Sequence, residues 1–358
     1  MVLERMRPGF RRLDYLSPKR FAREARDLAP STWLYVAHAS ELTKPGSYVA
    51  IEPWRERILV LRGRDLVLRA FVDRCPHRAV PITRDHEGVL PAQGLVCPYH
   101  GMAFSDDGLR RKAIAVLPSL SLEPRYVTEY AGHVFVAFGH APPPFASYVQ
   151  GAPPWLLEAS YASLERVHRT RYTTEANWKL LVENFQESWH FPAVHPSLHA
   201  RTPHGVTTST KLGPNWFGGT MRFEEGTHTV SPSRTLADRA HVAGKGWRKH
   251  VYDGFFYPLW LTSLQPDYFL SYRLTPRSPF ETEVQADIWG HASSVSGKKR
   301  GNWDEVVAFW NEVNLEDRTI VERQMRGVRS PSFRRMNLCT REEAGLLAFR
   351  ARYTRSMP

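Results

Sequence analysis

Short hydrophobic runs alternate with turn-forming residues along the first 140 positions of the chain. These runs are rich in β-branched and aromatic side chains, and Gly, Pro and Asp residues lie between them. Runs of this composition and spacing are typical of β-strands. The pattern predicts a small all-β domain over residues 33–140, with strands at 33–37, 48–51, 58–61, 66–72 and 133–138.

The residues before this domain, 1–32, are predicted to form an arm that contains a short helix. Ser17 followed by Pro18 favours a helix start, because serine caps free N–H groups and proline suits the first turn. Phe21 and Leu28 are its candidate buried contacts. After the β domain, two Pro-rich stretches indicate a linker over residues 141–164.

Longer periodic segments follow in residues 165–358, which we expect to form a second domain. A strand is predicted at 165–173, and a helix from about Glu175 through Glu187 and His190 to Pro192, which cannot continue it. Aromatic-rich strands are predicted at residues 216–221, 251–260, 268–274 and 284–289. The whole chain is therefore expected to be of the α+β class.

Residues 303–325 predict a long amphipathic helix, whose core-facing stripe would contain Trp310, Val313, Ile320 and Gln324. Asp317 lies in the middle of this stripe, whereas Glu316 is predicted on the polar flank. An ionised carboxylate on a core-facing stripe is costly unless it is paired or coordinates a metal. Asp317 is therefore expected to be a metal ligand, and the alternative is a buried salt bridge with an arginine.

Composition narrows the class of protein. The chain has 358 residues, of which 42% are hydrophobic and 12% aromatic, as in an ordinary globular protein. No apolar run approaches the roughly 20 residues of a membrane span, and the first ten residues lack the apolar core of a signal peptide. Three cysteines form no disulfide framework. We expect a cytoplasmic enzyme with no membrane segment.

The net charge of +12 is compatible with nucleic-acid binding, with an anionic partner, or with no binding role at all. Nucleic acid is disfavoured, because the basic residues are scattered and no recognised nucleic-acid motif accompanies them. A protein partner with an acidic surface is the preferred interpretation.

Two short loops carry the first group of metal-binding residues. Cys75-Pro76-His77 is followed by Cys97-Pro98-Tyr99-His100. Two thiolates and two imidazoles suit a Rieske [2Fe–2S] cluster, in which one iron has the sulfur ligands and the other the nitrogen ligands. A structural zinc site is the alternative, but zinc sites usually pair Cys with Cys and His with His.

A second group lies around the end of the helix predicted near Glu175. Glu187 and His190 are three residues apart, which would place them on one helix face, and His195 follows from the next segment. Two histidines with a carboxylate suit a mononuclear non-haem Fe(II) site. The alternative for a single histidine is an N-cap or a core position.

These motifs resemble those of ring-hydroxylating Rieske oxygenases, whose cluster loops are C-x-H-R and C-P-Y-H-G. Ala79 and Met102 stand where the family usually has Gly and Trp. Respiratory Rieske proteins are also similar, but they carry one further cysteine in each loop, where this chain has Val80 and Tyr99. The later segment from Asn177 resembles the family pattern N-W-K...E-N-F-x-E-x-x-H-x₄-H-P.

The resemblance implies a role for each candidate residue. It implies an N-terminal β domain that holds the cluster and a C-terminal helix-grip domain with a large antiparallel sheet. Glu187 corresponds to the acid that links an iron-ligand histidine to the cluster of a neighbouring subunit, and Asn184 is a further candidate catalytic residue. The expected cluster ligands are Cys75, His77, Cys97 and His100, and the expected iron ligands are His190, His195 and Asp317.

The resemblance also implies an activity and partners. We expect a terminal oxygenase subunit, a homotrimer, that takes electrons from NAD(P)H through a separate reductase, with or without a ferredoxin. The spacing of Glu187 is similar to that in choline, glycine betaine and carnitine monooxygenases, although the segment reads Glu187-Ser188-Trp189-His190 instead of the usual E-C-Y-H. This favours monooxygenation, by hydroxylation or oxidative demethylation. Ring cis-dihydroxylation, oxidative cyclisation and a pure electron carrier are the alternatives.

Overall fold

The computed structural model describes residues 6–112, 120–203, 208–211, 213–231, 241–297, 301–339 and 342–357. The chain divides into two compact units. We call Arg23–Pro144 the N-terminal domain, and Met1–Ala22 together with Phe145–Pro358 the C-terminal domain. The stretch 1–32 is therefore divided between the two units. Residues 141–164 contain the short helices α3 and α4, Phe145–Val149 and Pro154–Leu157, which belong to the C-terminal domain.

The N-terminal domain is built on an antiparallel sheet, and each strand predicted for it is present within two residues of the expected bounds. The strand order is β2 (Trp33–His38), β11 (His133–Ala137), β10 (Pro124–Tyr130), β5 (Leu68–Val72), β4 (Ile58–Arg62), β3 (Ser47–Ile51) and β6 (Glu87–Val89). A smaller sheet contains β7 (Leu95–Val96), β8 (Ala103–Phe104) and β9 (Arg110–Lys112). Short helical turns cover Glu24–Leu28, Ala29–Ser31, Ala39–Leu42 and Pro53–Arg55.

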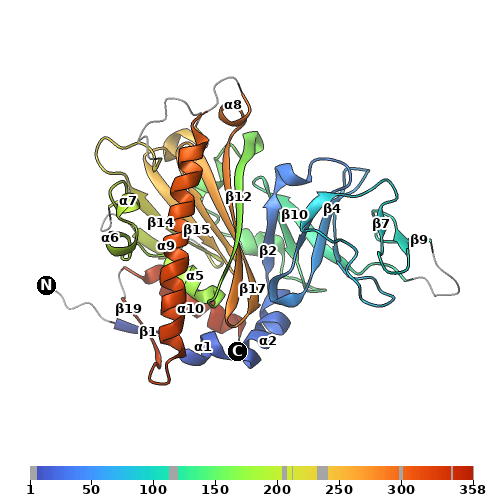
Figure 1. Ribbon diagram of the computed structural model, residues 1–358, viewed down its shortest axis with the longest axis horizontal. Helices are drawn as coiled ribbons and strands as arrows, with labels where there is room; N and C mark the ends of the chain where they lie inside the picture. Colours follow the sequence, from blue (N-terminus) through green and yellow to red (C-terminus); the bar gives the residue numbers. More distant parts are fainter. Residues whose placement is uncertain are drawn as a thin grey trace. The chain divides into compact units, whose positions relative to one another are not determined.

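The C-terminal domain is built on a second antiparallel sheet (Figure 1). Its order is β12 (Leu164–Thr174), β18 (Glu281–His291), β17 (Tyr268–Ser278), β16 (Trp260–Leu264), β15 (His250–Phe256), β14 (Trp216–Arg222) and β13 (Thr208–Lys211). The single strand predicted at 251–260 was wrong. The chain turns back at the cis peptide bond Tyr257–Pro258 and forms two paired strands, because proline cannot donate to the ladder.

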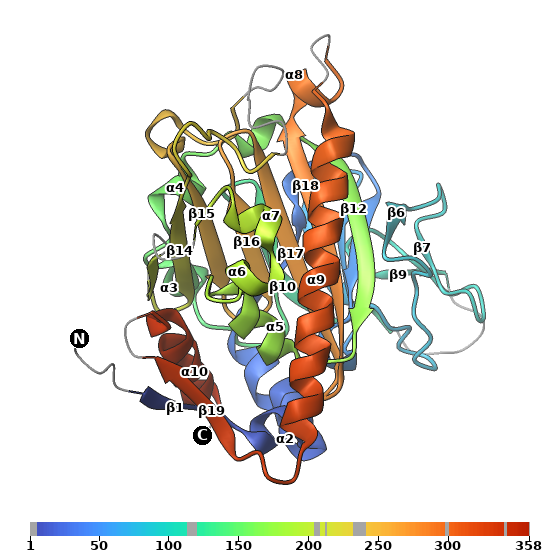
Figure 2. The same cartoon turned by 60° about the vertical axis from the view of Figure 1, so that its left-hand side comes forward.

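Helices cover one face of this sheet, where Figure 2 shows α5, α6, α7 and α9 together. They are α5 (Trp178–Phe185), α6 (Phe191–Val194), α7 (Pro196–His199) and α9 (Trp303–Arg329). The remaining elements are α1 (Arg12–Leu16), α2 (Pro18–Arg23), Tyr161–Ser163, Lys245–Trp247, α8 (Ala292–Val295), α10 (Ala344–Ser356) and the paired strands β1 (Met6–Arg11) and β19 (Arg335–Cys339). In the described part of the chain, no helix has the length and apolar character needed to cross a bilayer.

The segment around Glu187 differs from the expected helix. Helix α5 starts at its cap Asn177, whose side chain accepts a hydrogen bond from the Lys179 N–H, and it ends at Phe185. Glu187 therefore lies beyond the helix. Pro192 lies in the first turn of α6, where a proline is tolerated, instead of ending α5. The prediction that Glu187 and His190 share a helix face was wrong, although the two side chains do meet.

The long helix α9 is confirmed, but its core-facing stripe differs from the expected one. Trp310 and Val313 are buried, whereas Ile320 is only half-buried and Gln324 is exposed. The buried stripe continues through Val321, Met325 and Val328 instead. This shift follows the period of 3.6 residues, from which a strict heptad drifts along a straight helix.

Candidate metal centres

Two loops of similar geometry carry the cysteines and histidines of the N-terminal domain. In the first, the Cys75 N–H donates to the Val80 carbonyl at 2.8 Å and the Ala79 N–H donates to the Cys75 carbonyl at 2.9 Å. In the second, the same bonds join Cys97 with Met102 and Gly101, at 2.8 and 3.0 Å. Ala79 and Gly101 have φ values of 60° and 70°, in the region that favours glycine.

Only one of the two loops lies at the tip of a β-hairpin. The loop from Cys97 joins β7 and β8, which pair with each other. The loop from Cys75 joins β5 and β6, which are not neighbours, because β5 pairs with β4 and β10 while β6 pairs with β3. Sequence patterns alone did not distinguish the two, since a Cys-Pro pair opens both loops.

The sulfur atoms of the two cysteines lie in the core of the domain, and the imidazoles of the two histidines lie nearer its surface. Cys75 and Cys97 are each 2% exposed and are part of the apolar core of the domain, whereas His77 and His100 are half-buried. The two imidazole rings lie 4.8 Å apart between centroids. Burial raises the pKa of the Cys75 thiol, so a bound iron has to replace this proton. This donor set fits a [2Fe–2S] cluster with two sulfur and two nitrogen ligands.

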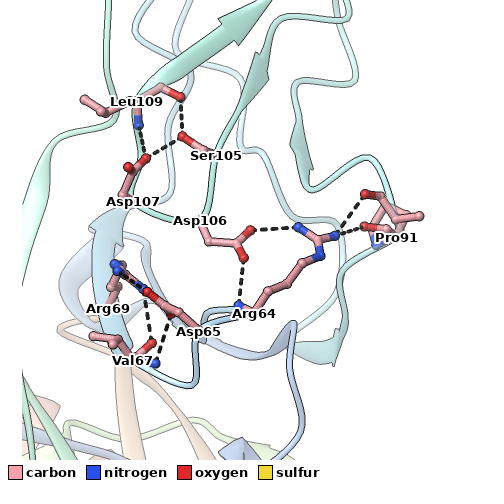
Figure 3. Close-up of polar contacts among 10 residues, drawn as sticks. Arg64, Asp65, Val67, Arg69, Pro91, Ser105, Asp106, Asp107 and Leu109 are labelled. Atoms are coloured by element: carbon pink, nitrogen blue, oxygen red, sulfur yellow. Dashed lines mark hydrogen bonds and ion pairs between the residues drawn. The ribbon is translucent and has the colours of Figure 1, made fainter.

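An arginine fixes the hairpin that carries Cys97 and His100 (Figure 3). The Arg64 guanidinium donates to Asp106 at 3.1 Å and to the carbonyls of Pro91 and Ala92 at 3.1 and 2.9 Å. The Arg64 backbone N–H also donates to Asp106, at 2.8 Å. Arg64 therefore ties the chain on both sides of the hairpin to the β4–β5 turn.

The C-terminal domain brings His190, His195 and Asp317 together. His190 is the N-cap of α6, His195 lies between α6 and α7, and Asp317 lies on α9. The Nε2 atoms of His195 and His190 lie 2.9 and 3.6 Å from Asp317 Oδ1, and the three ligand atoms lie within 4.8 Å of one another. Two histidines and one carboxylate at this separation fit the facial triad of a mononuclear iron site.

Each of the two imidazoles has a carboxylate partner on its other nitrogen. His190 Nδ1 lies 2.6 Å from Glu187 Oε1, and His195 Nδ1 lies 2.7 Å from Glu316 Oε2. A proton held on Nδ1 leaves the Nε2 lone pair for a metal. Burial opposes protonation of His195, but the carboxylates of Asp317 and Glu316 outweigh it and raise the pKa of that imidazole.

The contact of Glu316 was not predicted. The helical pattern placed Glu316 on the polar flank, whereas its side chain is 26% exposed, close to the 28% of Asp317. The signal that could have found it is its position directly before the expected ligand, at the border of the buried stripe. A buried stripe that is predicted from hydrophobic residues alone does not include a polar residue at its border.

Two cavities adjoin at His190 and Asn184. The first, about 80 Å³ in volume, is mainly apolar and lies between the sheet and the helices. The second, about 560 Å³, is more polar and includes Glu187, Glu183 and Arg323. His190 and Asn184 line both cavities. All three residues of the triad therefore border the apolar cavity, while Glu187 borders the more polar one.

Fold and site together define a class of protein. An all-β domain with two Cys–His loops, followed by an α+β domain with a two-histidine, one-carboxylate triad, defines a Rieske-type non-haem iron protein. The chain belongs to the family of ring hydroxylating alpha subunits. Residues 161–358 match the catalytic domain of that family, and residues 32–121 match the Rieske [2Fe-2S] domain. The [2Fe–2S] cluster and the mononuclear iron are features of this family.

Known proteins give the same assignment. The chain is 33% identical over 235 residues to the carnitine monooxygenase oxygenase subunit of Escherichia coli (strain K12), covering 60% of this chain and 61% of that protein. It is 29% identical over 192 residues to the glycine betaine monooxygenase oxygenase subunit of Chromohalobacter salexigens, covering 51% and 42%. In these matches the chain spans about half the length of the curated relatives.

Solved structures have the same fold. The quaternary ammonium Rieske monooxygenase CntA, in complex with an inhibitor, superimposes with a TM-score of 0.83 at 22% identity and covers 98% of this chain and 96% of its own. A naphthalene 1,2-dioxygenase gives a TM-score of 0.79 at 20% identity. The expected α+β fold, with a β-only cluster domain and a large antiparallel sheet in the second domain, is confirmed.

Proposed function

We propose that this chain is the terminal oxygenase component of a Rieske oxygenase. It uses O₂ and electrons from NAD(P)H, delivered by a separate reductase, to monooxygenate a small organic substrate. The observation that carries the proposal is the convergence of His190, His195 and Asp317 at the wall of an apolar cavity. A pure electron carrier needs only the cluster domain and has no use for such a triad.

Each residue has a part in this proposal. When bound, the cluster supplies electrons and the mononuclear iron binds and activates O₂. His190, His195 and Asp317 hold that iron through Nε2 and a carboxylate oxygen. Glu187 and Glu316 hold the imidazole protons on Nδ1 and so keep both rings in place. The apolar side chains of the cavity exclude bulk water from the substrate.

Glu187 has a second proposed role, as the link to the cluster of a neighbouring subunit. Its support is its position between His190 Nδ1 and the larger, more polar cavity. A single chain would then lack a complete electron path, and a homotrimer would supply one because heterologous contacts can close into a ring. Asn184 lines both cavities and is proposed to act beside Glu187. Monomeric protein with undiminished turnover would contradict this arrangement.

The proposed electron donor is an acidic ferredoxin or reductase in the cytoplasm. Its support is the net charge of +12, which attracts an acidic partner over long range. Salt should therefore slow turnover with the native donor, because exposed charges are screened at higher ionic strength. A turnover rate that does not change with salt would count against this kind of docking.

The proposed reaction is hydroxylation or oxidative demethylation, because carnitine and glycine betaine monooxygenases are among the similar proteins. The test is turnover under ¹⁸O₂ with carnitine, glycine betaine and anthranilate, recording NADH and O₂ consumption against product. We expect one labelled oxygen in a hydroxylated product, or one formaldehyde released per O₂ consumed in demethylation. Two labelled atoms on a ring would establish dihydroxylation, and electron transfer with neither labelled product nor formaldehyde for any substrate would favour the electron carrier.

A further inference from the structure

A carboxylate that the mechanism above does not use lines the same apolar cavity as the triad. Asp253 lies on β15, where it pairs with Gly219 of β14 and with Ser263 of β16. Gly219 has no side chain, and it lines a smaller cavity of about 20 Å³ together with Asp253. Asp253 and Ser263 both line the cavity that His190, His195 and Asp317 also line.

Asp253 has little compensation for its charge. Among the described residues its side chain has one polar partner, the hydroxyl of Ser263, which stabilises the charged form. Ser263 in turn accepts a hydrogen bond from Gln265 at 2.8 Å, so its own proton is available for Asp253. Among the described residues, no Arg, Lys or His forms an ion pair with Asp253. Burial therefore raises the pKa of Asp253 to about 7.

A structural carboxylate in the same sheet is arranged differently. Asp287 of β18 is 2% exposed, and it accepts two hydrogen bonds from Arg169, at 2.5 and 2.9 Å, and one from Gln285 at 2.9 Å. Such pairing is the usual condition for a buried carboxylate. Asp253 lacks this pairing and instead faces a cavity that a ligand can enter.

We infer that Asp253 is a specificity-determining residue, which binds a positively charged nitrogen of the substrate through its carboxylate. The inference rests on the proposed function and deepens it by naming the residue that selects the substrate. A cationic group beside Asp253 gives the carboxylate the charged partner that none of the described residues provides. Aromatic rings of the same cavity, among them Tyr272 and Trp310, suit the methyl groups of an alkylammonium ion.

The test compares two ligands that differ only in charge. Choline and 3,3-dimethylbutan-1-ol have the same shape, but the first has a cationic nitrogen where the second has a carbon. Calorimetric titration of the holoprotein, with both metal centres loaded, should show choline binding roughly 30-fold or more tightly than the alcohol. Asp253→Asn should remove most of this preference, because the amide keeps the shape and loses the charge.

A matched variant separates charge from hydrogen bonding. Ser263→Ala removes the hydroxyl partner but leaves the Asp253 carboxylate, so the preference for choline should remain. Equal binding of the two ligands by the wild-type protein, binding of neither, or an undiminished preference in Asp253→Asn overturns the inference. The wild-type comparison stands even where a variant fails to fold.

The iron content of the same samples distinguishes failure of this inference from failure of the proposed function. Holoprotein with about three irons per chain but no preference for choline contradicts the role of Asp253 alone. Holoprotein that retains only about two irons contradicts the oxygenase itself, and the role of Asp253 with it.

Discussion

The two metal centres differ in the hydrogen-bond partners of their histidines. In the C-terminal domain, each imidazole of the triad has a carboxylate on Nδ1, Glu187 for His190 and Glu316 for His195. In the described part of the N-terminal domain, neither His77 nor His100 has such a partner. An imidazole whose Nδ1 is hydrogen-bonded to a carboxylate is oriented before a metal binds. An imidazole without such a partner keeps a ring N–H that can donate to another molecule. The difference matches a centre that holds substrate chemistry and one that exchanges electrons with partners.

The centres also differ in how they are assembled. The cluster ligands lie on two loops within residues 75–100, and the core of one small domain supports both. The triad joins residues 190, 195 and 317, which come from short helices and from the long helix α9. The first centre depends on local turns, and the second on the packing of a whole domain.

The largest expected effect comes from substitutions that remove one metal centre and leave the other. Asp317→Ala should remove the mononuclear iron and leave the cluster, lowering the iron content from about three to about two per chain and turnover by more than about 100-fold. Cys97→Ala should remove the cluster, and with it the visible absorption, while the mononuclear iron stays bound. Asp304→Ala, an exposed carboxylate on the same helix as Asp317, is the control and should change neither. Loss of both metals in Asp317→Ala would show that the centres are not independent.

Glu187→Gln should have the next largest effect. The amide cannot carry the carboxylate charge, so coupled turnover should nearly vanish while both metals remain bound at saturating iron. Measuring NADH oxidation, O₂ uptake and product together detects this loss of coupling. A fully active Glu187→Gln protein would rule out the proposed link through this side chain.

Glu316→Gln should affect the iron itself more than the coupling. Loss of the carboxylate behind His195 should weaken Fe(II) affinity about 10–100-fold, because a hydrogen-bonded carboxylate increases the basicity of the ligand. Titration of iron-free protein with Fe(II) measures this change. Glu312→Gln, at an exposed position of the same helix, is the matched control. Unchanged Fe(II) affinity in Glu316→Gln would mean that packing alone orients His195.

The smallest expected effect on either metal concerns Glu183, which is buried beside the C-terminal centre. Burial raises the pKa of Glu183 to about 8, and Tyr15 donates to its carboxyl at 2.8 Å. The folded protein thus keeps a proton that the unfolded chain releases near the ordinary pKa, so folding stability should fall as pH rises from about 4.5 to about 8. Over this range Glu183→Gln should remove roughly 3–5 kcal/mol of pH dependence, as measured by urea unfolding.

The difference in pH dependence between the wild type and Glu183→Gln reports on Glu183 alone, because Asp253 titrates in both proteins. At pH 9 the Glu183→Gln protein should be the more stable one, since the wild type then buries a charge. Equal slopes of stability against pH in the two proteins would show that Glu183 is already ionised in the fold.

Local patterns predicted the local parts of the molecule. The strands of the N-terminal domain and the loops of Cys75 and Cys97 follow from short hydrophobic runs and turn residues, which act over a few positions. The spacing of His190 and His195 indicated a metal site for the same reason. The end of α5 at Phe185 was missed, because Gln186 and Glu187 follow it, which are good helix formers, and neither glycine nor proline marks the end.

Long-range contacts could not be predicted from the chain alone. The Glu316 contact depends on the exact rotation of α9 against α6, which a strict heptad misplaces. The position of Asp253 in the cavity depends on the register of β15 against β14 and β16, and on the turn at Pro258 that a single predicted strand concealed.

The most direct test of the central claim is the iron stoichiometry of anaerobically prepared holoprotein, measured together with its visible spectrum. Two irons in a cluster and one in the triad predict about three irons per chain, of which one disappears in Asp317→Ala while the spectrum stays unchanged. An active protein that holds only the two irons of the cluster would contradict the account.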